Sequence, residues 1–158
     1  MDKLEYIPGD LVMTNGVPCG TAKDVVYRVT SSDPTKTLEL GDGTVLKGIV
    51  CLENIEGAEF GDKGYLLGDC CAWVKDIVPV NLVPAILEKN GWRTQNRWYY
   101  YLDVVEGFIS YIGIDFKHKS NKGHLYVEVD GNNMVEIQYC HELQHFLFGL
   151  GLNHEMEV

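Results

Sequence analysis

"NRWYYYLDVVEGFISYIGIDFKHKSNKGHLYVEVD", residues 96–130, is the stretch that decides the fold of the second half of the chain. It contains three runs rich in aromatic and β-branched residues, "RWYYYLDV", "GFISYIGI" and "HLYVEVD", and this composition is typical of β-strands. The segments between the runs are shorter than the roughly twelve residues that a parallel crossover requires. The stretch therefore predicts three antiparallel strands.

Successive side chains of a strand point to opposite sides of a sheet, so these runs predict one aliphatic face and one polar-aromatic face. We expect helices to cover the aliphatic face. The other face carries the predicted ligand-binding residues: Arg97, Tyr99, Tyr101, His124 and Tyr126, with Tyr111 as a further candidate. An arginine and a histidine among tyrosines can stack on a flat ring and bind a phosphate or carboxylate. The alternative is an amphipathic sheet face on which the first half of the chain docks.

Helices are expected on both sides of the three runs. The segment "PVNLVPAILEKNGW", residues 79–92, predicts a short helix with Asn81 as N-cap, Pro84 in the first turn and Gly91 as the stop signal. After the turn "GNN", a last helix is expected from about Met134 to Leu150. Residues 80–158 thus read as an α-β-β-β-α half with antiparallel strands.

Residues 1–79 consist of short β-rich runs separated by turn signals. The runs are "DLVMT", "VVYRVT", "KTLEL", "VLKGIVCLEN" and "GYLLGDCCAWVKDIV", and the first three are followed by "NGVP", "SSDPT" and "GDGT". Strands at this spacing predict an SH3-like or other small barrel, or a curled sheet. The expected fold class is therefore α+β, in which the β-rich half, residues 1–79, packs on residues 80–158 as one compact unit.

The composition restricts the class of protein. A chain of 158 residues with a net charge of −10 and a pI near 4.8 lacks the positive surface that nucleic acid and anionic membranes attract. Its apolar stretches are shorter than a membrane span, and its start does not resemble a signal peptide, so we expect a cytoplasmic protein. The five cysteines are odd in number and contain no C-x-x-C pair, which favours reduced thiols. We expect Cys70 and Cys71 to be buried and to act as small hydrophobic residues.

The segment "CHELQHFLFG" contains the His-Glu-x-x-His spacing by which a helix can offer two imidazoles to zinc and a carboxylate to the attacking water. In helical projection His141 and His145 lie opposite the apolar sector, which fits a zinc site and an ordinary polar helix face equally well. A zinc site also needs a third ligand, and Gly151 stands where an extended motif would place a histidine. We favour the polar face, with no metal, no cofactor and no catalytic residue, and keep a zinc-dependent metallohydrolase using Glu142 as the alternative.

Three further segments carry a resemblance to a known family. The ending "VEIQYCHELQHFLFGLG", with "GDLVMTNGVPCGTAKDVVYRV" and "DIVPVNLVPAILEKNGW", resembles a family of small uncharacterised proteins of gut Bacteroides and of their prophages and phages. The closing helix in that family reads Tyr-Val-His-Gln-Leu-Gln-Asn, so His141, Leu143 and Gln144 match while Glu142 and His145 differ. The resemblance implies a phage or mobile-element gene that is expressed in a bacterial cytoplasm, and it implies no activity.

Together these observations predict a non-enzymatic phage or mobile-element accessory protein. It would bind a host small molecule, with a signalling nucleotide as one candidate, or a host protein, and counter-defence is a role that suits this context. Neither nucleic acid nor membrane is an expected partner, whereas a homo-oligomer is compatible with the sequence. Besides the metallohydrolase, a structural component of the virion is a further alternative.

Overall fold

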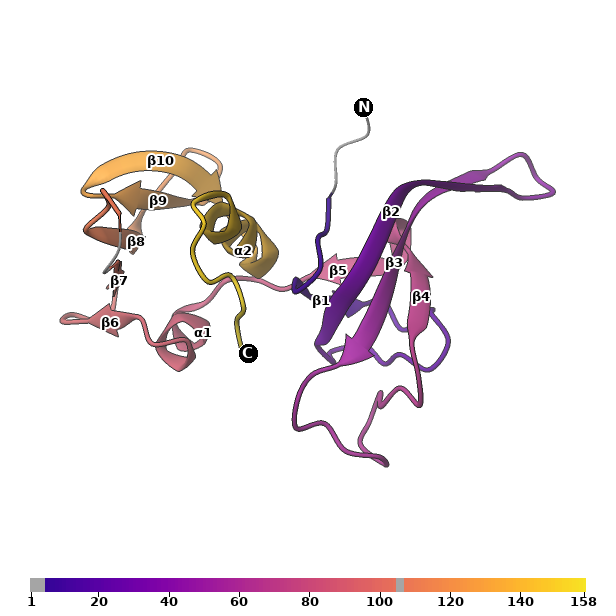
Figure 1. The fold of residues 1–158 in the computed structure, drawn as a ribbon. Coiled ribbons are helices and arrows are strands. Elements are labelled where there is room, and N and C mark those ends of the chain that lie inside the picture. Colours follow the sequence, from indigo (N-terminus) through magenta and orange to yellow (C-terminus); the bar gives the residue numbers. More distant parts are fainter. Residues whose placement is uncertain (1–4, 105–106) are drawn as a thin grey trace. The chain divides into compact units, whose positions relative to one another are not determined.

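The computed structural model describes residues 5–104 and 107–158. These residues form two five-stranded antiparallel sheets and two short α-helices (Figure 1), which confirms the predicted α+β fold class. The chain divides into two compact units. Unit 1 contains the described residues up to Val80 together with Gln144–Glu155, and unit 2 contains Asn81–Leu143 and Met156–Val158.

The sheet of unit 1 is an open antiparallel sheet in which the first strand lies between the second and the fifth. Its strands have the order β4-β3-β2-β1-β5. They are β1 (Leu11–Thr14), β2 (Tyr27–Glu39), β3 (Val45–Asn54), β4 (Cys70–Trp73) and β5 (Ile77–Pro79), and the short 3-10 helix η1 (Val74–Asp76) joins the last two. The sequence predicted a small barrel or a curled sheet. In the described residues no pairing joins β4 to β5, so this sheet is open rather than a closed barrel.

A single tyrosine holds two loops on the core of unit 1. Tyr27 is fully buried among aliphatic side chains that include Val12, Val50 and Leu52. Its hydroxyl accepts a hydrogen bond from the Ala22 amide and donates one to the carbonyl oxygen of Gly64. The first of these partners lies between β1 and β2 and the second between β3 and β4, so the ring fixes both loops to the same core.

The β2–β3 hairpin is longer than predicted. The sequence predicts a turn at "SSDPT", residues 31–35, but these residues belong to β2. The strand β2 instead runs through Pro34, and the pairing register shifts between Asp33 and Thr37. A proline is tolerated in a strand at such an irregularity, because it cannot donate a ladder hydrogen bond. Beyond this shift every described residue up to Val45 is exposed, and the hairpin extends past the other strands of its sheet as an arm (Figure 1).

The sheet of unit 2 contains the three predicted strands and two more, but the second predicted strand, residues 107–114, is observed at Tyr111–Lys119. Its order is β10-β9-β8-β7-β6, and all neighbours are antiparallel as expected. The strands are β6 (Arg93–Thr94), β7 (Tyr99–Asp103), β8 (Tyr111–Lys119), β9 (Leu125–Val129) and β10 (Asn132–Ile137). The predicted α-β-β-β-α pattern therefore omits β6 and β10, the two edge strands of this sheet.

The expected start of the closing helix at Met134 was wrong. The helix α2 is Cys140–Gly149, and β10 occupies the preceding residues. Asn132 pairs with Val129, so Asp130 and Gly131 form a two-residue hairpin loop, with φ angles of 51° and 86°. An Asp-Gly pair is favoured at both positive φ positions of a type I′ turn. This turn sends the chain back along β9 before the helix can begin.

The first helix, α1 (Pro84–Lys89), is close to its prediction. Pro84 is its first residue, as expected, but Val83 is the N-cap, while Asn81 forms a β-bridge with Tyr139. Gly91 follows the helix with a φ of 83°, as predicted for a stop signal. The prediction for this helix is therefore confirmed except for the identity of the N-cap residue.

Candidate functional site

Four partly buried tyrosines share one side of the unit 2 sheet, and we call this side the tyrosine face. They are Tyr99 and Tyr101 on β7, Tyr111 on β8 and Tyr126 on β9. Tyr100, Ile114 and Val127 pair across the three strands and are buried on the opposite side. The period-two pattern therefore separated the two sides as the sequence predicted. It also brings the predicted residues Tyr99, Tyr101 and Tyr126 to the same surface.

A glycine in the middle strand leaves space for the central ring of this face. Gly113 pairs with Tyr101 on one side and with Glu128 on the other. A Cβ atom at Gly113 would collide with the ring and hydroxyl of Tyr99, so the Tyr99 ring lies directly over the backbone of β8. The Tyr99 hydroxyl crosses this strand and donates a hydrogen bond of 2.8 Å to Glu128 Oε2.

The Tyr99 phenol is held in its neutral form. Burial raises its pKa well above the usual range, and the hydrogen bond to the Glu128 carboxylate raises it further because a phenolate beside a carboxylate is repelled. Tyr111 contributes in the same direction. Tyr99 is therefore a neutral hydrogen-bond donor to Glu128 at physiological pH.

The two predicted basic residues differ in their positions. His124 is at the end of the tyrosine face, where its Nδ1 lies 3.7 Å from Glu136 Oε2. Arg97 lies in the turn before β7 with a φ of 67°. Its charge acts on the phenol of Tyr100, which is buried on the opposite side of the sheet and donates to Glu88. His124 thus lies beside Glu136, which pairs with Tyr126, whereas Arg97 lies in a turn before β7.

Carboxylates outnumber cations on and beside the tyrosine face. The acidic side chains are Asp103, Asp115, Glu128 and Glu136, and the cations are Arg93 and Lys117, the second of which lies over the Trp98 ring beside Tyr99. The histidines His118 and His124 lie beside Asp115 and Glu136. Arg93 bonds Asp103 at 2.9 Å and lies over the Tyr101 ring, 5.5 Å from its centroid. The sequence did not assign Arg93 to the tyrosine face because β6 has only two residues, too few to give a strand pattern. With this charge balance, the face suits an uncharged or cationic flat molecule better than a phosphate.

The first two residues of the zinc-like motif contribute to the start of α2. Glu142 Oε1 accepts hydrogen bonds from the backbone amides of Gln138 and Tyr139, each at 3.0 Å. A carboxylate that reaches back in this way satisfies amides that have no partner within the helix. The His141 ring is 8% exposed and stacks on Tyr139, with 5.9 Å between the centroids.

The second half of α2 is anchored to the first strand of unit 1. Gln144 is fully buried, accepts a hydrogen bond from the Leu11 amide, and donates to the carbonyl oxygens of Gly9 and His154. His145 Nε2 lies 2.6 Å from Oδ2 of the buried Asp10. The expected polar helix face is therefore not open to solvent at His141, whereas His145 is partly exposed and contacts Asp10. Residues before β1 and after α2 cover Gln144. Within residues 5–104 and 107–158, no group of three or more His, Cys, Asp or Glu side chains is placed to hold a metal ion.

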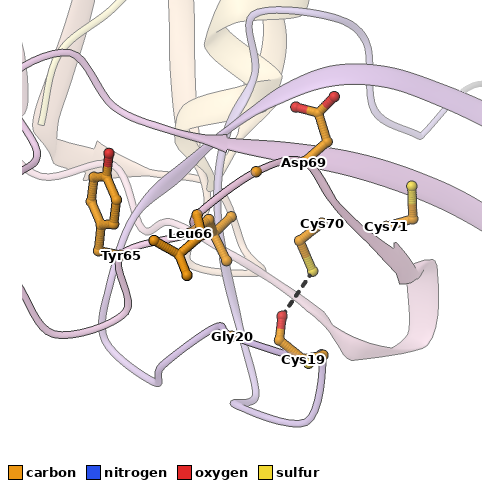
Figure 2. Close-up of a pocket in the computed structure, with 9 residues that line it drawn as sticks. Cys19, Gly20, Tyr65, Leu66, Asp69, Cys70 and Cys71 are labelled. Atoms are coloured by element: carbon orange, nitrogen blue, oxygen red, sulfur yellow. Dashed lines mark hydrogen bonds between the residues drawn. The ribbon is translucent and has the colours of Figure 1, made fainter. Parts of the chain in front are cut away.

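A pocket of about 420 Å³ lies in unit 1 between the loop after β1 and the end of the loop before β4 (Figure 2). It is lined by Cys19, Gly20, Tyr65, Leu66, Leu67, Gly68, Asp69, Cys70 and Cys71. The Asn54 side chain fixes Leu66 by bonding both its amide and its carbonyl oxygen. The Cys70 thiol donates to the carbonyl oxygen of Cys19 at 3.2 Å, which joins the two walls.

The two adjacent cysteines of this pocket differ from each other. Cys70 is buried as expected, and this burial raises the pKa of its thiol. Cys71 is exposed and points away from Cys70 (Figure 2), so the expectation that both are buried was wrong for Cys71. The alternation of side chains along β4 explains the difference.

Comparison with known proteins gives no family for the chain. None of the helices that the structure describes is long and apolar enough to cross a membrane. No family model matches the chain, and neither a search of curated proteins nor a search of solved structures finds a match.

Proposed function

We propose that the protein is a non-enzymatic binding protein and that its ligand lies on the tyrosine face. One observation carries this proposal: Tyr99, Tyr101, Tyr111 and Tyr126 gather on the side of the sheet opposite its buried aliphatic residues, and each ring stays partly exposed. Aromatic rings held in this way give a large contact area at a low cost in conformational entropy. The fixed Tyr99–Glu128 hydrogen bond adds an oriented polar group at the centre of the surface.

The charges of the face favour one kind of ligand. A flat molecule with amino groups could stack on the rings and donate hydrogen bonds to Glu128 or Glu136. A host signalling nucleotide could stack its base in the same place, but its phosphates would have to avoid four neighbouring carboxylates. We therefore place a flat amine or an uncharged heterocycle ahead of a nucleotide.

The resemblance to proteins of Bacteroides phages suggests where such binding would be used. A small acidic accessory protein in the bacterial cytoplasm could remove a host molecule from circulation during infection or lysogeny. This context supports a counter-defence role, in which the bound molecule is one that the host uses as a signal.

The proposal can be tested by recovering the ligand. The purified protein is incubated with bacterial extract and repurified, and any retained small molecule is released and identified by mass spectrometry. The double variant Tyr101→Ala, Tyr126→Ala should lose the molecule, whereas Phe60→Ala, which removes an exposed ring from unit 1, should retain it. Circular dichroism checks the folding of each variant. If nothing is retained by the wild-type protein, or if the double variant retains the molecule equally well, the tyrosine face is not the ligand site.

A further inference from the structure

Two cysteines face each other across the edge of the unit 1 sheet. Cys51 on β3 pairs with Cys71 on the edge strand β4. The neighbouring pairs, Val50 with Ala72 and Leu52 with Cys70, are buried on the core side of the sheet. Side chains alternate along both strands, so Cys51 and Cys71 share the opposite side. Cys71 is exposed and Cys51 is partly exposed, so small molecules in solution can reach the pair.

The distance between these positions suits a disulfide. Directly opposed residues of antiparallel strands have Cα atoms about 4.5 or 5.5 Å apart. Disulfides join residues whose Cα atoms are about 4.4–6.8 Å apart. The Cβ atoms of opposed residues are about 4.5–5.5 Å apart and those of a disulfide about 3.5–4.5 Å. A bond between the two cysteines therefore needs a rotation of the side chains and a small approach of the two strands.

The other thiols of unit 1 are less suitably placed. Cys70 is adjacent to Cys71 in sequence but points to the core side, and its thiol is bonded to the Cys19 carbonyl oxygen (Figure 2). A Cys70–Cys71 bond would require one of these side chains to leave its side of the strand. A Cys19–Cys70 bond would require the Cys70 thiol to give up its hydrogen bond with the backbone.

We propose that Cys51 and Cys71 form a reversible redox pair, with two thiols in the reduced protein and a cross-strand disulfide in the oxidised protein. A low-molecular-weight disulfide is the oxidant. One cysteine thiolate attacks a sulfur of this disulfide and releases the first small thiol. The second cysteine then attacks the mixed disulfide and releases the second small thiol. The protein loses two electrons and two protons, and the oxidant gains both.

Oxidation of this pair would restrict one wall of the pocket. Cys71 and Cys70 contribute to its lining, and residues 65–69 of the lining directly precede β4. A covalent link between β3 and β4 would hold the edge strand in its register. It would thereby restrict the wall of the pocket that continues into this strand. The pair is thus a modification site that connects the redox state to the pocket.

The test uses the full chain with oxidised glutathione as the probe. The fully reduced protein is equilibrated with mixtures of reduced and oxidised glutathione, quenched by alkylation and analysed by peptide mass spectrometry. The expected product has lost two hydrogens, links Cys51 to Cys71, and returns to thiols with dithiothreitol. In Cys51→Ser and Cys71→Ser, the remaining cysteine should instead carry one glutathione. The control Cys19→Ser should still form the link.

Two results would overturn the proposal. One is a disulfide in the wild-type protein that joins a different pair of cysteines. The other is a wild-type protein that keeps Cys51 and Cys71 unlinked in the most oxidising mixture. Both results are obtained with the wild-type chain, so they do not depend on the folding of a variant.

Discussion

Gln144 illustrates how one buried side chain can hold a segment in place. It is 0% exposed and makes three hydrogen bonds, with the Leu11 amide and with the carbonyl oxygens of Gly9 and His154. We expect Gln144→Ala to lower the free energy of unfolding by about 2–3 kcal/mol, because buried backbone groups lose their partners. Chemical denaturation measures this change. The control Gln138→Ala, at an exposed position, should change it by about 0.5 kcal/mol or less. Equal effects of the two substitutions would contradict this role.

Cys71 combines exposure with low reactivity. The hydrogen bond with the Cys51 thiol, burial and neighbouring groups raise its pKa from 9.0 to about 11. Only the thiolate reacts, so at neutral pH we expect iodoacetamide to alkylate Cys71 roughly a hundredfold more slowly than an unperturbed thiol. Because the thiol is an acid with a raised pKa, the rate should increase about tenfold per pH unit until the pH approaches that value. Peptide mass spectrometry over a pH series measures the rate.

The variant Cys51→Ala provides the comparison for this pH series. It removes the largest cause of the raised pKa, so Cys71 should react faster at neutral pH and its rate should level off at a lower pH. Rapid alkylation of Cys71 in the wild-type protein at pH 7 would show that the two thiols do not interact in this way.

At the scale of elements, Glu142 tests the meaning of the zinc-like motif. As the acceptor for two amides at the start of α2, it is expected to contribute about 1 kcal/mol to stability, and Glu142→Ala should remove this contribution. Glu142→Gln keeps an acceptor oxygen and should cost about 0.5 kcal/mol or less. Denaturation curves of the two variants measure the difference. If Glu142→Gln instead abolished a hydrolytic activity while a bound metal stayed in place, the metallohydrolase alternative would be correct.

The β9–β10 hairpin depends on the positive φ angle of Gly131. Replacement by alanine forces an L-residue into the left-handed region and places a Cβ 3.3 Å from the Tyr111 hydroxyl. We expect Gly131→Ala to reduce stability by about 1–2 kcal/mol. Gly149→Ala is the matched control, because its Cβ would meet no atom within 4 Å and the residue belongs to α2. It should leave stability unchanged or raise it by up to about 1 kcal/mol. Thermal melts of both variants decide whether the backbone angle matters.

Some elements could be predicted because their signals are local. The run "VLKGIVCLEN" predicts β3 with its observed ends, Val45–Asn54, and the position of Pro84 predicts the first turn of α1. The strand β10 was missed although Asp130-Gly131 is a strong hairpin signal, because the helical spacing of the apolar residues after it was extended too far towards the N-terminus. The arm does not follow from local signals, because Pro34 within "SSDPT" predicts a turn, whereas an irregularity in the pairing accommodates this proline within β2.

At the scale of the whole molecule, the net charge of −10 leads to a prediction about partners. The protein should not shift duplex DNA in a gel at physiological salt, because it lacks the cations that would release counterions from the phosphates. It should bind an anion exchanger at pH 7. A mobility shift that weakens as salt is added would contradict this expectation and would reveal a local basic surface that the net charge conceals.

The candidate site shows which features the sequence predicts and which depend on tertiary structure. Alternation within one strand was enough to place Tyr99 and Tyr101 on the same side. The pairing of Cys51 with Cys71 depends instead on the register across a 15-residue connection, from Ile55 to Asp69, which no local pattern specifies. Arg97 was assigned to the tyrosine face by its parity, but it lies in a turn where strand alternation does not apply. Local periodicity therefore predicts sides of strands, and packing decides which strands meet.

The arm formed by the β2–β3 hairpin offers a practical consequence for protein engineering. Its tip, Gly41 to Gly43, is exposed, and added Cβ atoms at these two glycines would meet nothing within 4 Å. Exposed loop tips of small and polar residues are where inserted sequences are best tolerated. A peptide epitope or a fluorescent label inserted there would leave the core of unit 1 and its pocket unaltered. The molecule thus has a natural attachment point for immobilisation on a sensor surface.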